Sequence, residues 1–202
     1  RRVPEFMKAL EGLNGMGAKA LWFTVMTTCR SGEIRGLLWS EFDEDAGAIT
    51  IAAERVKTRK QHVVPLPPAL VEFMKAMPKI KGERHVFAGL KRVKPLSDAS
   101  LLAVIKRMNK DNPTPYIDEN GESVVVNGFR ASFKTRAKES TDFPREVVEH
   151  AMAHQLADKA EAAYQRGTLF PKRIKLMAAW AAYCASPVAE GASITPIRAE
   201  AG

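Results

Sequence analysis

The stretch AKALWFTVMTTCRSGEIRGLLWSE, residues 18–41, decides the fold that the sequence predicts. Its apolar side chains recur at i, i+3, i+4, i+7 and i+8, the spacing of one helix face, at Ala18, Leu21, Trp22, Val25 and Met26. A helix is therefore predicted to lead up to Arg30. A second, short helix is predicted from Ser31, whose hydroxyl can cap it, to about Leu38. Arg30 then lies at a helix entrance.

Downstream of this stretch the pattern changes from helix to strand and back to helix. Residues 48–52 and 62–66 have strand character, and the basic segment between them predicts a small antiparallel sheet with a charged loop. Further helices are predicted around 70–77, after a cap at Ser97, and at 127–138, 144–153 and 172–185. In the last helix the residues expected to share one apolar face are Ile174, Met177, Ala181 and Cys184. The predicted fold class is mainly α with a small antiparallel β-sheet, α+β.

The charge of the chain indicates a polyanionic partner. Lys and Arg number 31 against 23 Asp and Glu, a net charge of +8, which suits nucleic acid or a membrane surface. No run approaches the ~20 apolar residues that cross a bilayer and no secretion signal is visible, so we expect a cytoplasmic protein. Cys29 and Cys184 lack Cys-x-x-Cys spacing, so neither a zinc site nor a disulfide framework is predicted, and both thiols are expected to be reduced and packed.

The ends of the chain differ from its body in composition. Residues 1–186 are expected to form one domain, whereas 187–202, rich in Ala, Gly, Pro and Glu without any period, are expected to be a disordered tail. Because the sequence opens on Arg1 rather than Met, we expect it to be a piece of a longer protein that continues on the N-terminal side.

Five short motifs follow one another along the chain. They are Thr28-Cys29-Arg30-Ser31-Gly32-Glu33-Ile34 leading to Leu38-Trp39-Ser40-Glu41, then Arg55-Val56-Lys57 before His62-Val63-Val64-Pro65-Leu66, Gly128-Phe129-Arg130, His154, and Ala163-Tyr164-Gln165-Arg166-Gly167. In this order, from about residue 4 to 186, they resemble the catalytic domain of tyrosine recombinases, in particular the integrases of temperate phages and genomic islands. The resemblance implies a site-specific DNA recombinase that cuts and rejoins DNA through a 3′-phosphotyrosyl intermediate, with no cofactor and no metal.

The chemistry of a phosphodiester explains why such an enzyme needs these residue types. Negative charge builds on the phosphate oxygens in the transition state, so fixed cationic donors are the main catalytic resource. By resemblance, Arg30 and Arg130 are the two phosphate-clamping arginines. Tyr164 is the nucleophile, which attacks phosphorus and releases a 5′-hydroxyl. Its competitors are less favoured, since Tyr116 lies in a Pro-rich loop away from the motifs and Tyr183 is expected to pack.

Other positions match the family's remaining site residues. His154 matches a histidine that can hydrogen-bond a phosphate oxygen. Lys57 matches the hairpin lysine that protonates the leaving 5′ oxygen, although Lys60 is an alternative three residues on. The residues expected to bind DNA around it are Arg55, Arg59, Lys60 and His62. Glu33 is interpreted as a structural residue that orients the short helix or Arg30, and a solvated surface carboxylate is the alternative.

One position departs from the family's pattern. Asn127 stands where a histidine is common, and with Arg130 it can share a helix face and aim at one phosphate. An amide donates a hydrogen bond but cannot exchange a proton, so charge stabilisation is expected to survive while an acid or base role is lost or passes to water. Two alternatives to an active recombinase therefore stay open: a DNA-binding domain of the same fold with impaired catalysis, and a type IB topoisomerase.

The resemblance also implies partners. The family acts on double-stranded DNA in the bacterial cytoplasm, self-associates there, usually as a tetramer on two sites, and can use accessory DNA-bending or directionality proteins. An N-terminal DNA-binding domain is implied that this sequence lacks. Whether the helix at 172–185 packs on its own domain or on a neighbour's is left open.

Overall fold

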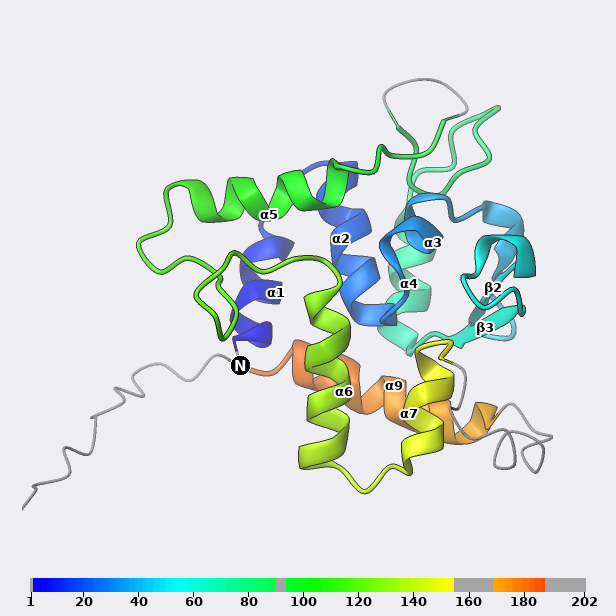
Figure 1. Cartoon of the computed structure of the whole chain (residues 1–202). Coiled ribbons are helices and arrows are strands. Elements are labelled where there is room, and N and C mark those ends of the chain that lie inside the picture. The colour runs from blue at the N-terminus through cyan, green and yellow to red at the C-terminus, as the bar shows by residue number, and fades with distance from the viewer. Residues whose placement is uncertain (1, 90–93, 155–168, 188–202) are drawn as a thin grey trace, which may run out of the picture.

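The computed structural model describes residues 2–89, 94–154 and 169–187 (Figure 1). The helices are α1 (Val3–Glu11), α2 (Met16–Thr27), α3 (Ser31–Arg35), α4 (Pro68–Ala76), α5 (Ser100–Lys110), α6 (Gly128–Ser140), α7 (Arg145–Ala151) and α9 (Phe170–Cys184), with 3₁₀ turns η1 (Trp39–Glu41) and η2 (Ala53–Arg55). The strands β1 (Phe42–Asp43), β2 (Ala48–Ile51) and β3 (His62–Pro65) form one antiparallel sheet. The predicted α+β class is confirmed.

Helix α2 lies at the centre of the fold. It is apolar nearly all round, and such a helix is stable only when other elements cover every face. Accordingly it packs against α1, α3, α5 and α9, and Leu21 and Phe23 are fully buried. The helix ends at Thr27, and Thr28 takes a left-handed conformation, with φ of 56°, that turns the chain into Arg30. The predicted helix leading up to Arg30 is confirmed.

Helix α3 differs from its prediction in its N-terminal cap and in its last residue. It begins at Ser31 as expected, but its cap is the carboxylate of Glu33, which accepts a hydrogen bond from the Arg30 backbone N–H at 2.8 Å. A carboxylate reaching back to the N-cap amide satisfies a donor that the helix leaves free. The helix ends at Arg35, before the predicted Leu38, and Gly36 follows as its C-cap. The Ser31 cap was therefore wrong, while the position of Arg30 at a helix entrance is confirmed.

The sheet has the predicted strands and register. β2 pairs with β1 on one side and with β3 on the other, so that Ile49 faces Val64 and Ile51 faces His62. Residues 52–61 connect β2 and β3 and contain η2 and the basic segment. In Figure 1 the labelled strands β2 and β3 lie at one side of the molecule, away from α1 and α5. The sheet thus lies at the side of the fold, and the loop between β2 and β3 carries charged residues.

The later helices are confirmed, with shifted ends. α5 starts at Ser100, three residues after the predicted cap, and Pro144 is the residue before α7 rather than its first. In α9, Ile174 is 47% exposed and does not share the buried face, which instead holds Arg173, Leu176, Met177, Trp180, Ala181 and Cys184. This face is centred on Met177, Trp180 and Cys184 because α9 packs against α7, α2, α1 and β3 at once, and Ile174 falls at its edge.

Three expectations from composition concern the cysteines, a membrane crossing and the tail. Cys29 and Cys184 are both free and buried, as expected. Within the described ranges no helix combines the length and the apolar character that a membrane crossing needs. The predicted tail lies almost wholly in 188–202, outside the described residues.

Candidate active site

Arg30 is held at the entrance of α3 by one carboxylate. Its guanidinium donates to Glu33 Oε1 at 3.1 Å, while its backbone N–H donates to Glu33 Oε2 at 2.8 Å. Glu33 is 3% exposed, which excludes the alternative of a solvated surface carboxylate, and the Arg30 side chain is 25% exposed. A buried carboxylate therefore orients a guanidinium that still reaches the surface.

Arg130, near the start of α6, is buried beside the same helix entrance. It is 5% exposed, and its guanidinium donates to the backbone carbonyl of Thr28 and to that of Met152, the latter at 2.7 Å. Burial lowers the pKa of Arg130, and the positive charge of Arg30 lowers it further. The hydrogen bond to the Thr28 carbonyl, two residues before Arg30, places Arg130 beside the entrance of α3, although the two arginines come from segments far apart in the sequence.

His154 joins this cluster from the turn after α7. Its Nε2 lies 3.1 Å from an Arg130 guanidinium nitrogen, and its Nδ1 lies 2.7 Å from Glu149 Oε2. The other oxygen of Glu149 forms an ion pair with Lys134 Nζ at 2.6 Å. Burial raises the pKa of Glu149, but the hydrogen bonds from Lys134 and His154 outweigh it and leave that pKa lowered. A buried carboxylate thus supports His154 as another supports Arg30.

The hairpin presents only some of its predicted DNA-binding residues. Lys57, Arg59 and Lys60 are exposed in the connection between β2 and β3. Arg55 is instead paired with the carboxylate of Glu41 and also donates to the backbone carbonyl of Glu33, so it ties the hairpin to α3.

His62 requires a correction. Its side chain is 5% exposed and faces the core, so it cannot reach a DNA surface unless the hairpin moves. The basic segment beside His62 in the sequence does not reveal that the His62 side chain is buried.

His62, Cys29 and Glu33 form a buried polar group beneath the arginines. One ligand atom from each lies within 4.8 Å of the others, which makes them the group in the described residues that could hold a metal ion. Three observations argue against a cation there: both Glu33 oxygens already bond Arg30, burial raises the pKa of Cys29 to about 12, and Arg30, Arg130 and Arg173 all act electrostatically on the group.

Two predicted site residues remain, Asn127 and Tyr164. Asn127 is exposed as the N-cap of α6, and its side chain forms no capping hydrogen bond. Tyr164 lies outside the described residues. The competing tyrosines are both packed: Tyr116 meets the ring of Phe6 edge-on at 5.0 Å, and Tyr183 contacts Trp180 and lies under a guanidinium. Neither tyrosine belongs to one of the five motifs, and none of these ring contacts involves Arg30, Arg130 or His154.

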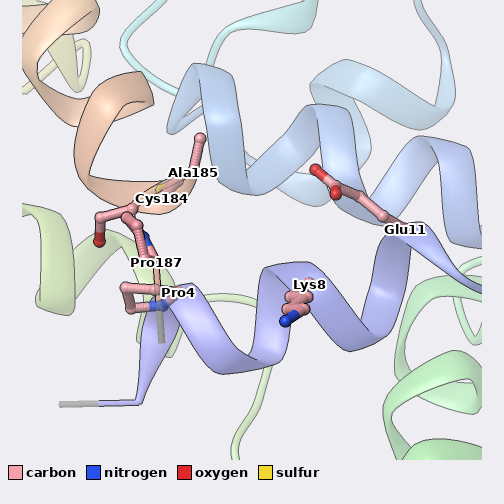
Figure 2. Close-up of a pocket in the computed structure, with 7 residues that line it drawn as sticks. Pro4, Lys8, Glu11, Cys184, Ala185 and Pro187 are labelled. Atoms are coloured by element: carbon pink, nitrogen blue, oxygen red, sulfur yellow. The ribbon is translucent and has the colours of Figure 1, made fainter. Parts of the chain in front are cut away.

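The hollows in the surface lie elsewhere. One of about 640 Å³ lies between α1 and the end of α9, where Figure 2 shows Pro4, Lys8 and Glu11 with Cys184 and Pro187. None of the predicted site residues lines it.

The chain is similar to known proteins of one family. The model of the phage integrase family matches residues 2–168. The chain is 30% identical over 188 residues to the prophage integrase IntS of Escherichia coli K12 and 29% identical over 188 residues to the integrase of Shigella phage Sf6; each match covers 89% of this chain and 45% of the relative. No solved structure matches.

The chain therefore belongs to the phage integrase family. It spans less than half the length of these two relatives.

Sequence reasoning missed three residues around the site: the buried Glu149 and Arg173, and the exposed Lys134. Glu149 and Lys134 looked like ordinary charges on amphipathic helices. Arg173, 3% exposed, donates to the backbone carbonyl of Val63 and so links α9 to β3. The one local signal was the position of Glu149 between two apolar neighbours and the histidine motif, which indicates a partly buried carboxylate.

Proposed function

We propose that this chain is the catalytic domain of a tyrosine-type site-specific DNA recombinase. The observation that carries the proposal is the meeting of Arg30, Arg130 and His154 from three distant segments, with two of their side chains linked at 3.1 Å. Two guanidiniums and an imidazole in one place are suited to hold a phosphate and stabilise the charge that develops on it. Family membership supports the same reaction.

The proposed reaction is one exchange of phosphate esters. The Tyr164 phenol gives its proton to solvent water, and its oxygen attacks the phosphorus of a phosphate that Arg30, Arg130 and His154 hold. The bond from phosphorus to the 5′ oxygen breaks as the phosphotyrosyl bond to the 3′ phosphate forms, and Lys57 gives the leaving oxygen its proton. Attack by a 5′-hydroxyl reverses these steps, so the ester energy is conserved and no ATP is needed.

The proposed substrate is double-stranded DNA. The exposed cations Lys57, Arg59 and Lys60 on one hairpin support a contact with the backbone, whereas the burial of His62 and the ion pair of Arg55 favour structural roles for those two. We further propose residues 1–186 as one catalytic unit of a longer protein that acts in the bacterial cytoplasm. Self-association as a tetramer, and help from accessory DNA-bending or directionality proteins, remain proposals drawn from the family.

A catalytically impaired DNA-binding domain is the second candidate. The observation in its favour is Asn127, exposed beside α6 and unable to transfer a proton. A topoisomerase is distinguished by relaxation of supercoiled plasmid without any specific site.

A nicked suicide duplex tests these proposals. The nick lets the short 5′-hydroxyl product diffuse away, so an active enzyme is trapped as a covalent complex on DNA that carries the junction between element and host. We expect such a complex for the wild-type chain and none for Tyr164→Phe. Tyr183→Phe is the matched control, since it removes a hydroxyl from a packed ring and should cleave normally. Absence of a covalent complex with the wild type would favour the impaired domain, and a complex that survives Tyr164→Phe would refute the nucleophile.

A further inference from the structure

A continuous series of polar contacts joins four side chains at the candidate site. Lys134 Nζ lies 2.6 Å from Glu149 Oε1, Glu149 Oε2 lies 2.7 Å from His154 Nδ1, and His154 Nε2 lies 3.1 Å from the Arg130 guanidinium. The series connects α6 to the turn after α7 and returns to α6. Its central member, Glu149, touches neither the arginine nor the surface where DNA would lie.

We propose that Glu149 is a positioning residue for strand cleavage: it fixes the imidazole of His154 in the tautomer whose proton is on Nδ1 and so directs Nε2 to Arg130 and the phosphate. The inference rests on the recombinase function proposed above and assigns to Glu149 a role in that same site.

The chemistry of the two groups gives the proposal its direction. An ionised carboxylate only accepts hydrogen bonds, so the ring nitrogen that faces Glu149 must carry a proton. A neutral imidazole has one such proton, and its other nitrogen is then an acceptor that suits the N–H of Arg130. If the ring gains a second proton, that nitrogen becomes a donor aimed at a phosphate oxygen. In both states Nε2 has the orientation that the site needs.

Burial makes the hydrogen bond to Nδ1 effective. The Glu149 side chain is 7% exposed, so water competes little for its oxygens, and a hydrogen bond in such surroundings is stronger than on the surface. The pKa of Glu149 is lowered: burial raises it, but Lys134 and His154 together lower it more. The carboxylate therefore stays ionised at neutral pH.

Glu149 holds His154 by its backbone as well. The His154 backbone N–H donates to the Glu149 carbonyl at 2.9 Å, and Ala153 between them takes a left-handed conformation, with φ of 49°. This turn folds the chain back after α7, so that a ring five positions later meets the side chain that precedes it. Two attachments to one residue leave the ring little freedom to rotate.

The experiment compares two Glu to Gln changes on α7 in the whole 202-residue chain. Glu149→Gln removes the charge and one obligatory acceptor, whereas Glu146→Gln makes the same change on the same helix away from His154 and serves as the matched control. Three quantities are measured: the single-turnover rate of covalent complex formation on the nicked duplex, the affinity for the same DNA, and the ring ¹⁵N signals of His154, which His154→Gln assigns by their loss.

We expect the Nδ1–H tautomer in the wild type and in Glu146→Gln, and a mixed or Nε2–H tautomer in Glu149→Gln. The cleavage rate of Glu149→Gln should fall by about tenfold or more, while its DNA affinity stays within about twofold, because a proton on Nε2 would face the Arg130 N–H and disturb the groups that stabilise the transition state rather than those that bind DNA. Glu149→Asp keeps the charge, so it should retain more of the Nδ1–H tautomer, and it replaces Glu149→Gln if thermal melting shows that variant unfolded.

Two results would overturn the inference: a wild-type cleavage rate in Glu149→Gln, or the same ring tautomer with and without the carboxylate. A merely structural role would lower stability and DNA affinity together and leave the tautomer unchanged. If the wild type forms no covalent complex, the recombinase proposal itself fails, and the ring signals alone then decide whether Glu149 positions His154.

Discussion

The buried imidazole of His62 makes the stability of this chain depend on pH. Burial, followed by the charges of Arg173, Arg130 and Arg30, lowers the pKa of His62 from an ordinary 6.5 to about 3. Between these two values the unfolded chain binds a proton at this position and the folded chain does not. Linkage then requires the free energy of unfolding to fall as the pH drops from 6.5 towards 3.

The size of the effect follows from the two pKa values. Each pH unit below the unfolded pKa costs about 1.4 kcal/mol, so by pH 5 this one histidine should remove about 2 kcal/mol of the stability present at pH 8. That is a large share of the total for a domain with the usual ~5–15 kcal/mol. His62→Gln places an uncharged amide of similar size at this position. The free energy of unfolding of the variant should therefore lack the pH-dependent loss that His62 causes.

Urea unfolding of the wild type and of His62→Gln at pH 8 and pH 5 measures the loss of stability that His62 causes. We expect the difference between the two proteins to shift by about 2 kcal/mol in favour of the variant when the pH falls. The stability of the variant at pH 8 does not matter, because other acidic groups titrate equally in both proteins and cancel in the comparison. A difference that is the same at both pH values, within about 0.5 kcal/mol, would refute the view that the fold keeps His62 neutral.

The remaining predictions concern the two arginines. Glu33→Gln leaves only one good acceptor for the backbone and side chain of Arg30, so we expect the single-turnover cleavage rate to fall about tenfold with DNA affinity nearly unchanged; an unaltered rate would mean that Arg30 needs no such support. Arg130→Lys keeps a charge, but a single ammonium cannot replace the planar fork that spans the carbonyls of Thr28 and Met152. It should cut the cleavage rate by about 10² or more and lower the melting temperature, and a variant with wild-type values of both would exclude the clamp.

The fold class was predictable because local composition separates long apolar helices from short strands. The apolar run of α2 and the β-branched residues of β2 and β3 are signals that depend only on neighbours in sequence, although α2 is covered on nearly all sides rather than on one face. Caps were less predictable, because several polar side chains compete for each helix end. At α3 the distant end of Glu33 displaced the hydroxyl of Ser31, and in α9 contacts with four elements at once shifted the buried face away from Ile174.

The candidate site was predictable in part for the same reason. Arg30, Arg130 and His154 lie in short motifs that a local pattern identifies, and the structure brings them together. Glu33 could be assigned to Arg30 from the sequence because the two residues are three positions apart. The burial of His62 and the contact of Glu149 with His154 depend on tertiary packing, so the sequence indicated neither of them.

The arrangement of charge in this site explains why its arginines are buried at all. Arg130 is desolvated and repelled by Arg30, and His62 is forced to remain neutral beneath them, so each group lies in surroundings that disfavour a positive charge. Such a cluster costs stability in the free protein, and the compensating groups present, Glu33 and Glu149, are occupied in orienting Arg30 and His154. An anion placed between the guanidiniums would relieve the repulsion, and the relief is largest when its negative charge is largest, in the transition state of phosphoryl transfer. The burial of these cationic groups is therefore the feature that would let the site favour the transition state over the ground state.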